Sequence, residues 1–265
     1  MTLQHVNPVR CVYSREQVCQ AYWDACSELG LPPTVSLVKV LVAHGALESG
    51  NFKIGLWNNN PGNIKLGART SGPYTCITLN EVLKDKATGR FVERWFSPEG
   101  ELSASPNNGG KLLRAPLPVP PGHPQTRMRA YPTLSEGISD KLRFLLHPGW
   151  AVALEFAARG SASGYVRSIR SRGYFTAFAG EPDPTPYEMS VVKLAAAYEP
   201  IVEAVASRHE PVAFEPPVFE EARDAQRLNL IDPELRARIE TTVTILLDDA
   251  LQGVREDMRG PDWRR

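Results

Sequence analysis

One glutamate and an asparagine-rich segment lie close together in residues 46–65 and could carry acid–base chemistry on a sugar. Glu48 ends an apolar stretch, and residues 57–65 then read Trp-Asn-Asn-Asn-Pro-Gly-Asn-Ile-Lys. A carboxyl group at the end of an apolar helix can have its pKa raised until it stays protonated near neutrality, and it can then protonate a glycosidic oxygen. The neighbouring amides suit hydroxyl and acetamido groups. We therefore expect Glu48 to be a general acid acting on an N-acetylated glycan.

Capping signals and apolar periodicity predict the helices that position this segment. Ser14 followed by Gln17 is typical of a capping box and predicts a helix reaching about Gly30. The stretch from about Thr34 to Glu48 is apolar almost all round, which predicts a central buried helix. Further helices are predicted from Thr133 onward, over 149–159 and 161–172, and from Pro186 to about Ser207.

A small amount of β-structure is expected between these helices. Residues from about Tyr74 to Val82 and from Gly89 to Phe96 are rich in β-branched and aromatic types, which predicts a β-hairpin. Residues 97–125 then gather prolines, glycines and asparagines, which predicts a long loop without regular structure. Such a loop could be a lid, a partner contact or a tolerated surface insertion, and the sequence does not choose among them.

Composition excludes several classes of function. An apolar fraction of 42% in 265 residues is enough for a sizeable core, and no window of about 18 uninterrupted apolar residues predicts a membrane span. Nine arginines, no lysine and 13 acidic residues give residues 207–265 a net charge of −4, so the remainder of this neutral chain carries +4. That excess is too small for a nucleic-acid footprint. Four cysteines without CxxC spacing predict no metal site.

Four sequence blocks, in order over residues 34–202, resemble the lysozyme-like glucosaminidase family of flagellum-associated and autolysin-type peptidoglycan hydrolases and their phage relatives. The blocks are Ala-Leu-Glu-Ser-Gly at 46–50, the Asn-rich Gly-Asn-Ile-Lys block at 58–65, Met-Arg-Ala-Tyr at 128–131 with the helix after it, and Gly-Tyr at 173–174 with Asp183, Pro184 and Tyr187. Each block is weak alone, and their shared order makes the resemblance fairly specific.

The resemblance implies an α+β, mainly α fold of the lysozyme type, with a small β-hairpin lobe and a cleft between lobe and helices. It puts Glu48 at the family's catalytic acid position and implies no cofactor and no metal. Glu81 on the hairpin would be the second carboxylate, and Asp85 and Glu93 are the next candidates for that role. Tyr174 would line the cleft near the reacting sugar. The expected substrate-binding residues are Trp57, Asn60, Asn63, Tyr131 and Tyr187.

The expected reaction is cleavage of a β-1,4 bond in the glycan strand of peptidoglycan, by an N-acetylglucosaminidase or a muramidase. Glu81 would act as base or nucleophile, depending on its separation from Glu48. Without a second carboxylate, the substrate's acetamido group or its 6-hydroxyl could attack, and the latter would make the enzyme a lytic transglycosylase. His44, one turn before Glu48, is expected to be a neutral packed imidazole without a catalytic role.

The chain is expected to hold a lysozyme-like domain over residues 1–206, with a loop insertion at 97–127, a linker at 207–219 and a helical tail at 220–265. The apolar stripe of the tail must pack on its own domain or on another chain. Because the N-terminus does not read as a secretory signal, we expect a protein that is made in the cytoplasm and acts on the cell wall or periplasm. It could arrive there as a free endolysin, or as part of a phage tail or injection particle docked through the tail. A catalytically weak or inactive structural component of such a particle is the alternative.

Overall fold

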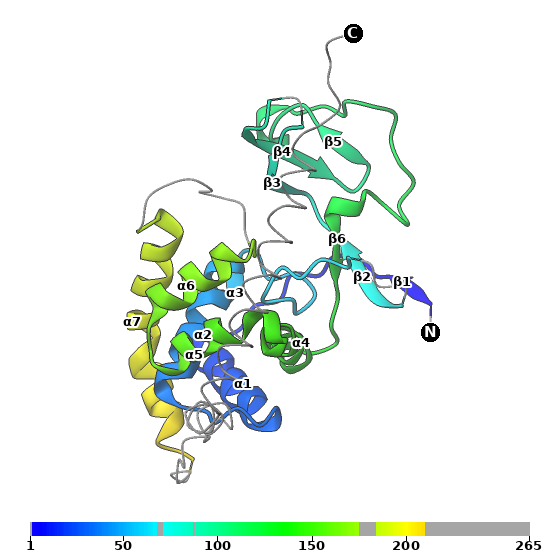
Figure 1. The fold of residues 1–265 in the computed structure, drawn as a ribbon. Coiled ribbons are helices and arrows are strands. Elements are labelled where there is room, and N and C mark those ends of the chain that lie inside the picture. Colours follow the sequence, from blue (N-terminus) through cyan, green and yellow to red (C-terminus); the bar gives the residue numbers. More distant parts are fainter. Residues whose placement is uncertain (1, 68–70, 87, 175–183, 210–265) are drawn as a thin grey trace, which may run out of the picture. The chain divides into compact units, whose positions relative to one another are not determined.

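A computed structural model describes residues 2–67, 71–86, 88–174 and 184–209 (Figure 1). The chain divides into two units, residues 1–212 and 213–265, and all described residues belong to the first. The predicted tail at 220–265 and nearly all of the predicted linker at 207–219 lie outside the described residues, as does Asp183 of the last sequence block. The docking role of the tail therefore stays a prediction.

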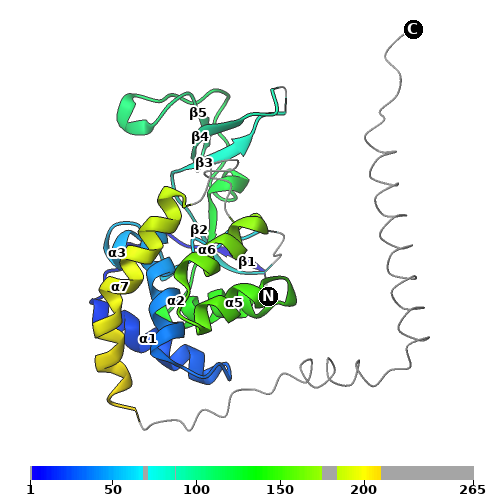
Figure 2. The ribbon, with the colours of Figure 1, turned by 60° about the vertical axis from the view of Figure 1, so that its left-hand side comes forward.

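Helices dominate the described residues and enclose one hydrophobic core. The central helix α2 is buried over most of its length and packs against α1, α5 and α7 (Figures 1 and 2). This confirms the central buried helix predicted from the sequence. The helices are α1 (Arg15–Glu28), α2 (Val35–Glu48), α3 (Gly50–Lys53), α4 (Leu134–Leu146), α5 (Ala151–Ala158), α6 (Ala162–Ser171) and α7 (Pro186–Ala206).

Side-chain oxygens cap the starts of the helices other than α5, which has no such cap. Ser14 accepts a hydrogen bond from the Gln17 amide, and the Gln17 side chain accepts one from the Ser14 amide, so the predicted capping box is confirmed. Thr34 and Thr133 cap α2 and α4 through the amide three residues on, and Ser161 does the same for α6. Each cap satisfies one of the free amides at a helix start, which explains why the predicted starts agree with the structure.

In the described part of the chain, six short strands form two sheets. One sheet has the order β1 (Leu3–His5), β2 (Gly72–Cys76) and β6 (Arg127–Arg129), and the other has the order β3 (Leu79–Lys84), β4 (Phe91–Ser97) and β5 (Gly100–Leu102). The pairing of β3 with β4 confirms the predicted hairpin. The single strand predicted from Tyr74 to Val82 is wrong, because the chain leaves the first sheet after Cys76 and enters the second at Leu79. Since β1 and β6 are distant in sequence, local composition could not reveal this division.

The predicted loop at 97–125 contains some regular structure. Strand β5 pairs with β4, and short 3₁₀ helices occupy Pro106–Asn108 and Pro124–Thr126. The expectation of no regular structure was wrong there, because the hydrogen bonds that β4 offers to β5 outweigh the breakers in the sequence around it.

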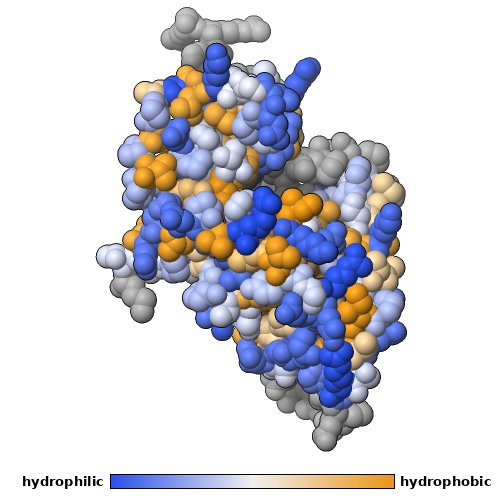
Figure 3. Space-filling model, turned by 180° about the vertical axis from the view of Figure 1, so that it is seen from behind, coloured by the Kyte–Doolittle hydropathy of each residue, from blue (hydrophilic) through white to orange (hydrophobic). Residues whose placement is uncertain are grey.

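The architecture is α+β and mainly helical, as predicted. Within the described segments, no helix combines the length and the apolar character that a membrane span requires. On the face seen in Figure 3, hydrophilic and hydrophobic side chains are interspersed over the helices and the strands.

Candidate active site

The chain turns sharply after Glu48, at the end of α2. Ser49 is fully buried, and its hydroxyl accepts a hydrogen bond from the Phe52 amide (3.1 Å). Gly50, Asn51 and Phe52 then follow with φ of 57°, 58° and 57°. The left-handed region is strained for a bulky residue, so Phe52 must be held there by its surroundings, and its side chain is fully buried. Packing therefore fixes the backbone that carries Glu48.

The asparagines after this turn build the backbone of residues 58–64. Asn58, Asn59 and Asn63 all have positive φ, a conformation that asparagine tolerates better than most residues. The Asn60 side chain is buried and bonds the amide and carbonyl of Ile64 (both 2.9 Å) and a carbonyl of β6 (3.0 Å). These bonds use both the nitrogen and the oxygen of the Asn60 side-chain amide, so in this conformation few of its hydrogen bonds remain for the predicted contact with a sugar.

The Glu48 carboxyl group meets three other side chains. Tyr187 of α7 donates a hydrogen bond to Oε1 (2.5 Å), and Asn63 Nδ2 lies 3.3 Å from Oε2 and 2.7 Å from the Glu48 carbonyl oxygen. Nε2 of His44, one helical turn earlier, lies 3.7 Å from Oε1. The Glu48 side chain keeps 17% of its surface exposed, so the carboxyl group is held firmly but is not sealed. The structure thus brings together Glu48, Asn63 and Tyr187, three of the predicted site residues.

His44 supports this arrangement as a neutral imidazole. Its ring is fully buried, and Nδ1 lies 2.6 Å from the Tyr165 hydroxyl. Burial, with help from the Lys141 charge, lowers the pKa of His44 to about 4, which confirms the predicted neutral form. If the Tyr165 hydroxyl donates to Nδ1, the ring proton is on Nε2 and points toward Glu48.

Lys141 is a member of this group that sequence analysis missed. Its side chain is almost completely buried in α4, and burial lowers its pKa to about 8 against the opposing effect of the Glu48 charge. The signal that could have revealed it is helical spacing. Lys141 lies seven residues after Leu134, three after Ile138 and four before Leu145, so it falls on the apolar face of its helix.

The charge of Glu48 differs from the sequence-based expectation. Burial works to raise its pKa, but His44, through a hydrogen bond and through its charge at acid pH, the Tyr187 hydroxyl and the positive charge of Lys141 together outweigh it and lower the pKa to about 2. The expectation that this carboxyl group stays protonated near neutrality is therefore wrong for the free protein. His44 lies one turn before Glu48 in α2, but Tyr187 and Lys141 belong to other helices, α7 and α4, so the sequence around Glu48 could indicate only the first of these partners.

We expect Tyr187→Phe to raise the pKa of Glu48 by removing the hydroxyl donor. Since this pKa lies below its ordinary value of 4.5, ionised Glu48 stabilises the fold above pH 4.5, and that stability is lost as the pH falls toward 2. In the variant, ionised Glu48 contributes less stability, because its pKa lies closer to the ordinary value. Its melting temperature should therefore fall below that of the wild type by more at about pH 6 than at about pH 3.

Tyr131→Phe is a matched control for this experiment. The Tyr131 hydroxyl donates to Oδ2 of Asp140 at the same distance, 2.5 Å, without a hydrogen bond to Glu48. Its removal should leave the titration of Glu48 unchanged, as followed by NMR of the ¹³C-labelled carboxyl group. An unchanged Glu48 titration in Tyr187→Phe would show that the hydroxyl does not hold the carboxylate.

The Tyr174 ring packs against His44 and is the first of a set of neighbouring aromatic rings. Its hydroxyl donates to the Gly62 carbonyl (3.2 Å), and its ring centre lies 5.0 Å from that of His44. Phe144 and Trp150 lie 6.0 and 5.9 Å from Tyr174 and 5.1 Å from each other. Phe144 is 37% exposed, so this aromatic cluster (Phe144, Trp150 and Tyr174) runs from the buried imidazole to the surface.

Three predicted site residues form other contacts. Glu81 pairs with Lys65 (2.8 Å), Trp57 lies under the Arg10 guanidinium (5.1 Å), and Tyr131 bonds Asp140. None of the three forms a hydrogen bond with Glu48 among the described residues. The weaker candidates Asp85 and Glu93 are bonded within the β3–β4–β5 sheet, to Arg94 (2.8 Å) and Asn80 (2.5 Å).

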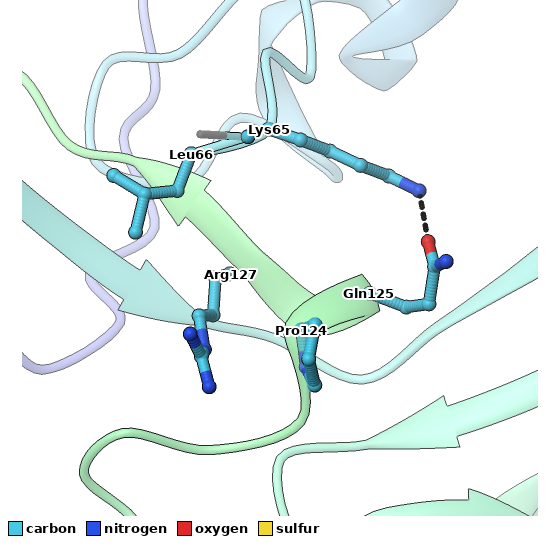
Figure 4. Close-up of a pocket in the computed structure, with 6 residues that line it drawn as sticks. Lys65, Leu66, Pro124, Gln125 and Arg127 are labelled. Carbon is cyan, nitrogen blue, oxygen red and sulfur yellow. Dashed lines mark hydrogen bonds between the residues drawn. The ribbon is translucent and has the colours of Figure 1, made fainter. Parts of the chain in front are cut away.

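A small cavity of about 230 Å³ lies beside the Lys65–Glu81 pair. In Figure 4, the Lys65 and Gln125 side chains meet across a 2.7 Å hydrogen bond, and Pro124 and Arg127 lie below them. Glu48 does not line this cavity. The described residues contain no group of three or more His, Cys, Asp or Glu side chains placed to hold a metal ion.

The site is a buried cluster of one carboxylate, one neutral imidazole and one ammonium group at the end of the central helix of an α+β protein. We call it the Glu48 cluster (His44, Glu48, Asn63, Lys141, Tyr165, Tyr174 and Tyr187). No family model and no curated protein matches this sequence. Among solved structures, the chain is similar to a peptidoglycan hydrolase mutant from Sphingomonas sp. A1, with 18% identity over 73% of this chain and 99% of that chain and a TM-score of 0.43. The function proposed below rests on the site itself rather than on this distant likeness.

Proposed function

We propose that this protein cleaves β-1,4 glycosidic bonds in the glycan strand of peptidoglycan, with Glu48 as the proton donor. The observation that carries the proposal is the Glu48 carboxyl group itself. It is partly exposed at the end of a buried helix, and Tyr187 and Asn63 hold its two oxygens from separate elements. A carboxyl group oriented in this way is what acid catalysis on a glycosidic oxygen requires.

The surroundings of Glu48 suit a neutral sugar. The Asn63 amide and the tyrosine hydroxyls offer neutral hydrogen-bonding groups, and burial raises the pKa of Tyr174 and Tyr187, so both hydroxyls stay protonated. The aromatic cluster provides ring surface beside them, on which a pyranose ring could pack.

Because Glu48 is ionised in the free protein, it must take up a proton before it can donate one. A bound sugar would remove water from the carboxylate and compete for the Tyr187 hydroxyl, and both changes raise the pKa of Glu48. Each pH unit above that pKa lowers the protonated fraction about tenfold. We therefore expect the rate of cleavage to increase toward acid pH.

The second step of the reaction has several candidate routes. Glu81 would act as the base for an attacking water, or as nucleophile, if the hairpin brings it to the substrate, which requires that its ion pair with Lys65 opens. Otherwise the acetamido group of the substrate could attack, or its 6-hydroxyl in a transglycosylase reaction. The bond that is cut decides whether the enzyme is a glucosaminidase or a muramidase.

Purified protein and isolated peptidoglycan test the proposal directly. We expect the turbidity of the suspension to fall faster at about pH 5 than at about pH 8, because protonated Glu48 is the active form. Mass spectrometry of the released fragments identifies the new sugar ends, and so the bond that is cut. Fragments with free reducing ends indicate hydrolysis, and anhydro ends indicate attack by the 6-hydroxyl. Intact glycan strands at every pH would contradict the proposal and favour a structural component of a particle, docked through residues 220–265.

A further inference from the structure

We propose that Lys141 is a positioning residue whose buried ammonium group stabilises the ionised form of Glu48 and thereby lowers the pH range of the proposed cleavage. The link between the two side chains stands on the burial of Nζ without a hydrogen-bond partner, and on the turn at Gly62 and Asn63, which packs on Lys141 and bonds Glu48. Its consequence for the pH range rests on the proposed function.

Lys141 is buried without the partners that a buried charge normally has. Only 1% of the residue is exposed, and Nζ has no hydrogen-bond partner among the described residues. The carboxylate next to it in sequence, Asp140, is bonded instead to Arg129 (2.5 Å) and Tyr131 (2.5 Å). An isolated buried ammonium group is costly, so its compensation must come from a charge nearby. Glu48 supplies that compensation, since its charge is what opposes the effect of burial on the pKa of Lys141.

The turn that holds Glu48 also covers Lys141. A Cβ added to Gly62 would lie 3.0 Å from Cδ and 3.3 Å from Cγ of Lys141, so the lysine stem runs directly beneath this glycine. The next residue, Asn63, bonds Glu48. The ammonium group therefore cannot move to solvent unless the turn that positions the carboxyl group moves as well.

The other titratable groups around Lys141 are neutral at pH 7. Burial lowers the pKa of His44, and burial raises the pKa of each tyrosine near it. Lys141 and Glu48 are then the two charged members of the described cluster, and each stabilises the charge of the other. The groups concerned are Tyr22 of α1, His44 and Glu48 of α2, Tyr165 of α6, Tyr187 of α7 and Tyr174, with Asp140 and Arg129 paired to each other nearby.

The Lys141 charge works against acid catalysis at high pH. By favouring the carboxylate, Lys141 opposes the proton uptake that acid catalysis by Glu48 requires, and so it restricts activity to lower pH. Removal of the charge should let Glu48 hold its proton at higher pH. Lys141 would then act through Glu48 and would not touch the substrate.

The test is NMR titration of the ¹³C-labelled carboxyl group of Glu48 in wild type and in Lys141→Met. We expect the midpoint to move upward in the variant by up to about 1 pH unit, since an opposite charge is lost while His44 and Tyr187 remain. Lys141→Arg keeps the charge and should move it less. Lys39→Met is the matched control, because Lys39 lies on the same helix as Glu48 but pairs with Glu199, and its loss should not move the midpoint.

An unchanged midpoint in Lys141→Met would overturn the proposal. If that variant does not fold, the wild type still answers the question, because the Glu48 resonance should show a second, smaller inflection where Lys141 titrates, near pH 8. A Glu48 resonance without this inflection would also overturn it.

The activity assay separates this inference from the proposed function. If the protein cleaves peptidoglycan, the alkaline limb of the Lys141→Met profile should move upward with the NMR midpoint, giving about tenfold more relative activity per pH unit of displacement. A limb that stays in place while the midpoint moves would overturn the catalytic part. An inactive wild type would refute the proposed function, and the NMR midpoint would still decide whether Lys141 stabilises the ionised form of Glu48.

Discussion

Glu48→Gln should lower the rate of glycan cleavage by about 10²- to 10⁴-fold, the usual contribution of a positioned general acid. The amide keeps the size of the side chain, and its oxygen can still accept the Tyr187 hydrogen bond, but it has no proton to donate to a leaving oxygen. The measurement is the initial rate of peptidoglycan clearance at acid pH, with circular dichroism to show that the variant is folded.

Two further carboxylates complete this experiment, Glu199 as its control and Glu81 as a test of the second step. Glu199→Gln removes a carboxylate that pairs with Lys39, away from the Glu48 cluster, and should leave the rate unchanged. Glu81→Gln examines the second step. A large loss indicates that Glu81 takes part, and a small one leaves the nucleophile to the substrate. If Glu48→Gln is as active as wild type, Glu48 is not the acid and the mechanism proposed above is refuted.

Gly137→Ala should destabilise the fold by about 3 kcal/mol, at the upper end of the range for an overpacked core site. Gly137 lies in α4 against the asparagine turn, and a Cβ there would lie 1.8 Å from the carbonyl oxygen of Asn59. Because that oxygen belongs to the backbone, no rotation of a side chain can relieve the contact. Alanine favours a helix over glycine by about 1 kcal/mol, which the clash should exceed.

The change should be visible as a fall in melting temperature of roughly 6–12 °C for a domain of this size. Gly149→Ala is the matched control, because its added Cβ would have its nearest neighbour at 3.4 Å, an ordinary contact with the His147 ring. A Gly137→Ala variant that melts with the wild type would mean that α4 does not pack against the asparagine turn as described.

The helices were the most predictable part of the fold because their signals are local. Caps at Ser14, Thr34 and Ser161 act on amides within three residues, so the sequence around them is enough to place a helix start. The β-strands were less predictable. The run from Tyr74 to Val82 looks like one strand, yet its two halves belong to different sheets, whose partner strands include segments far away in the chain.

Glu48 and its neighbours in the turn could be picked out from residue types and order, because an acid at the end of an apolar helix is a local pattern. That much, with the mainly helical α+β class, the amino-acid sequence determined by itself. The charge of Glu48 was decided by local and tertiary contacts together. Its pKa depends on His44, one turn earlier in the same helix, but also on Tyr187, 139 residues away, and on Lys141, which lies in a helix after both sheets. Electrostatic and hydrogen-bond energies depend on distance in space, and only the folded chain sets those distances.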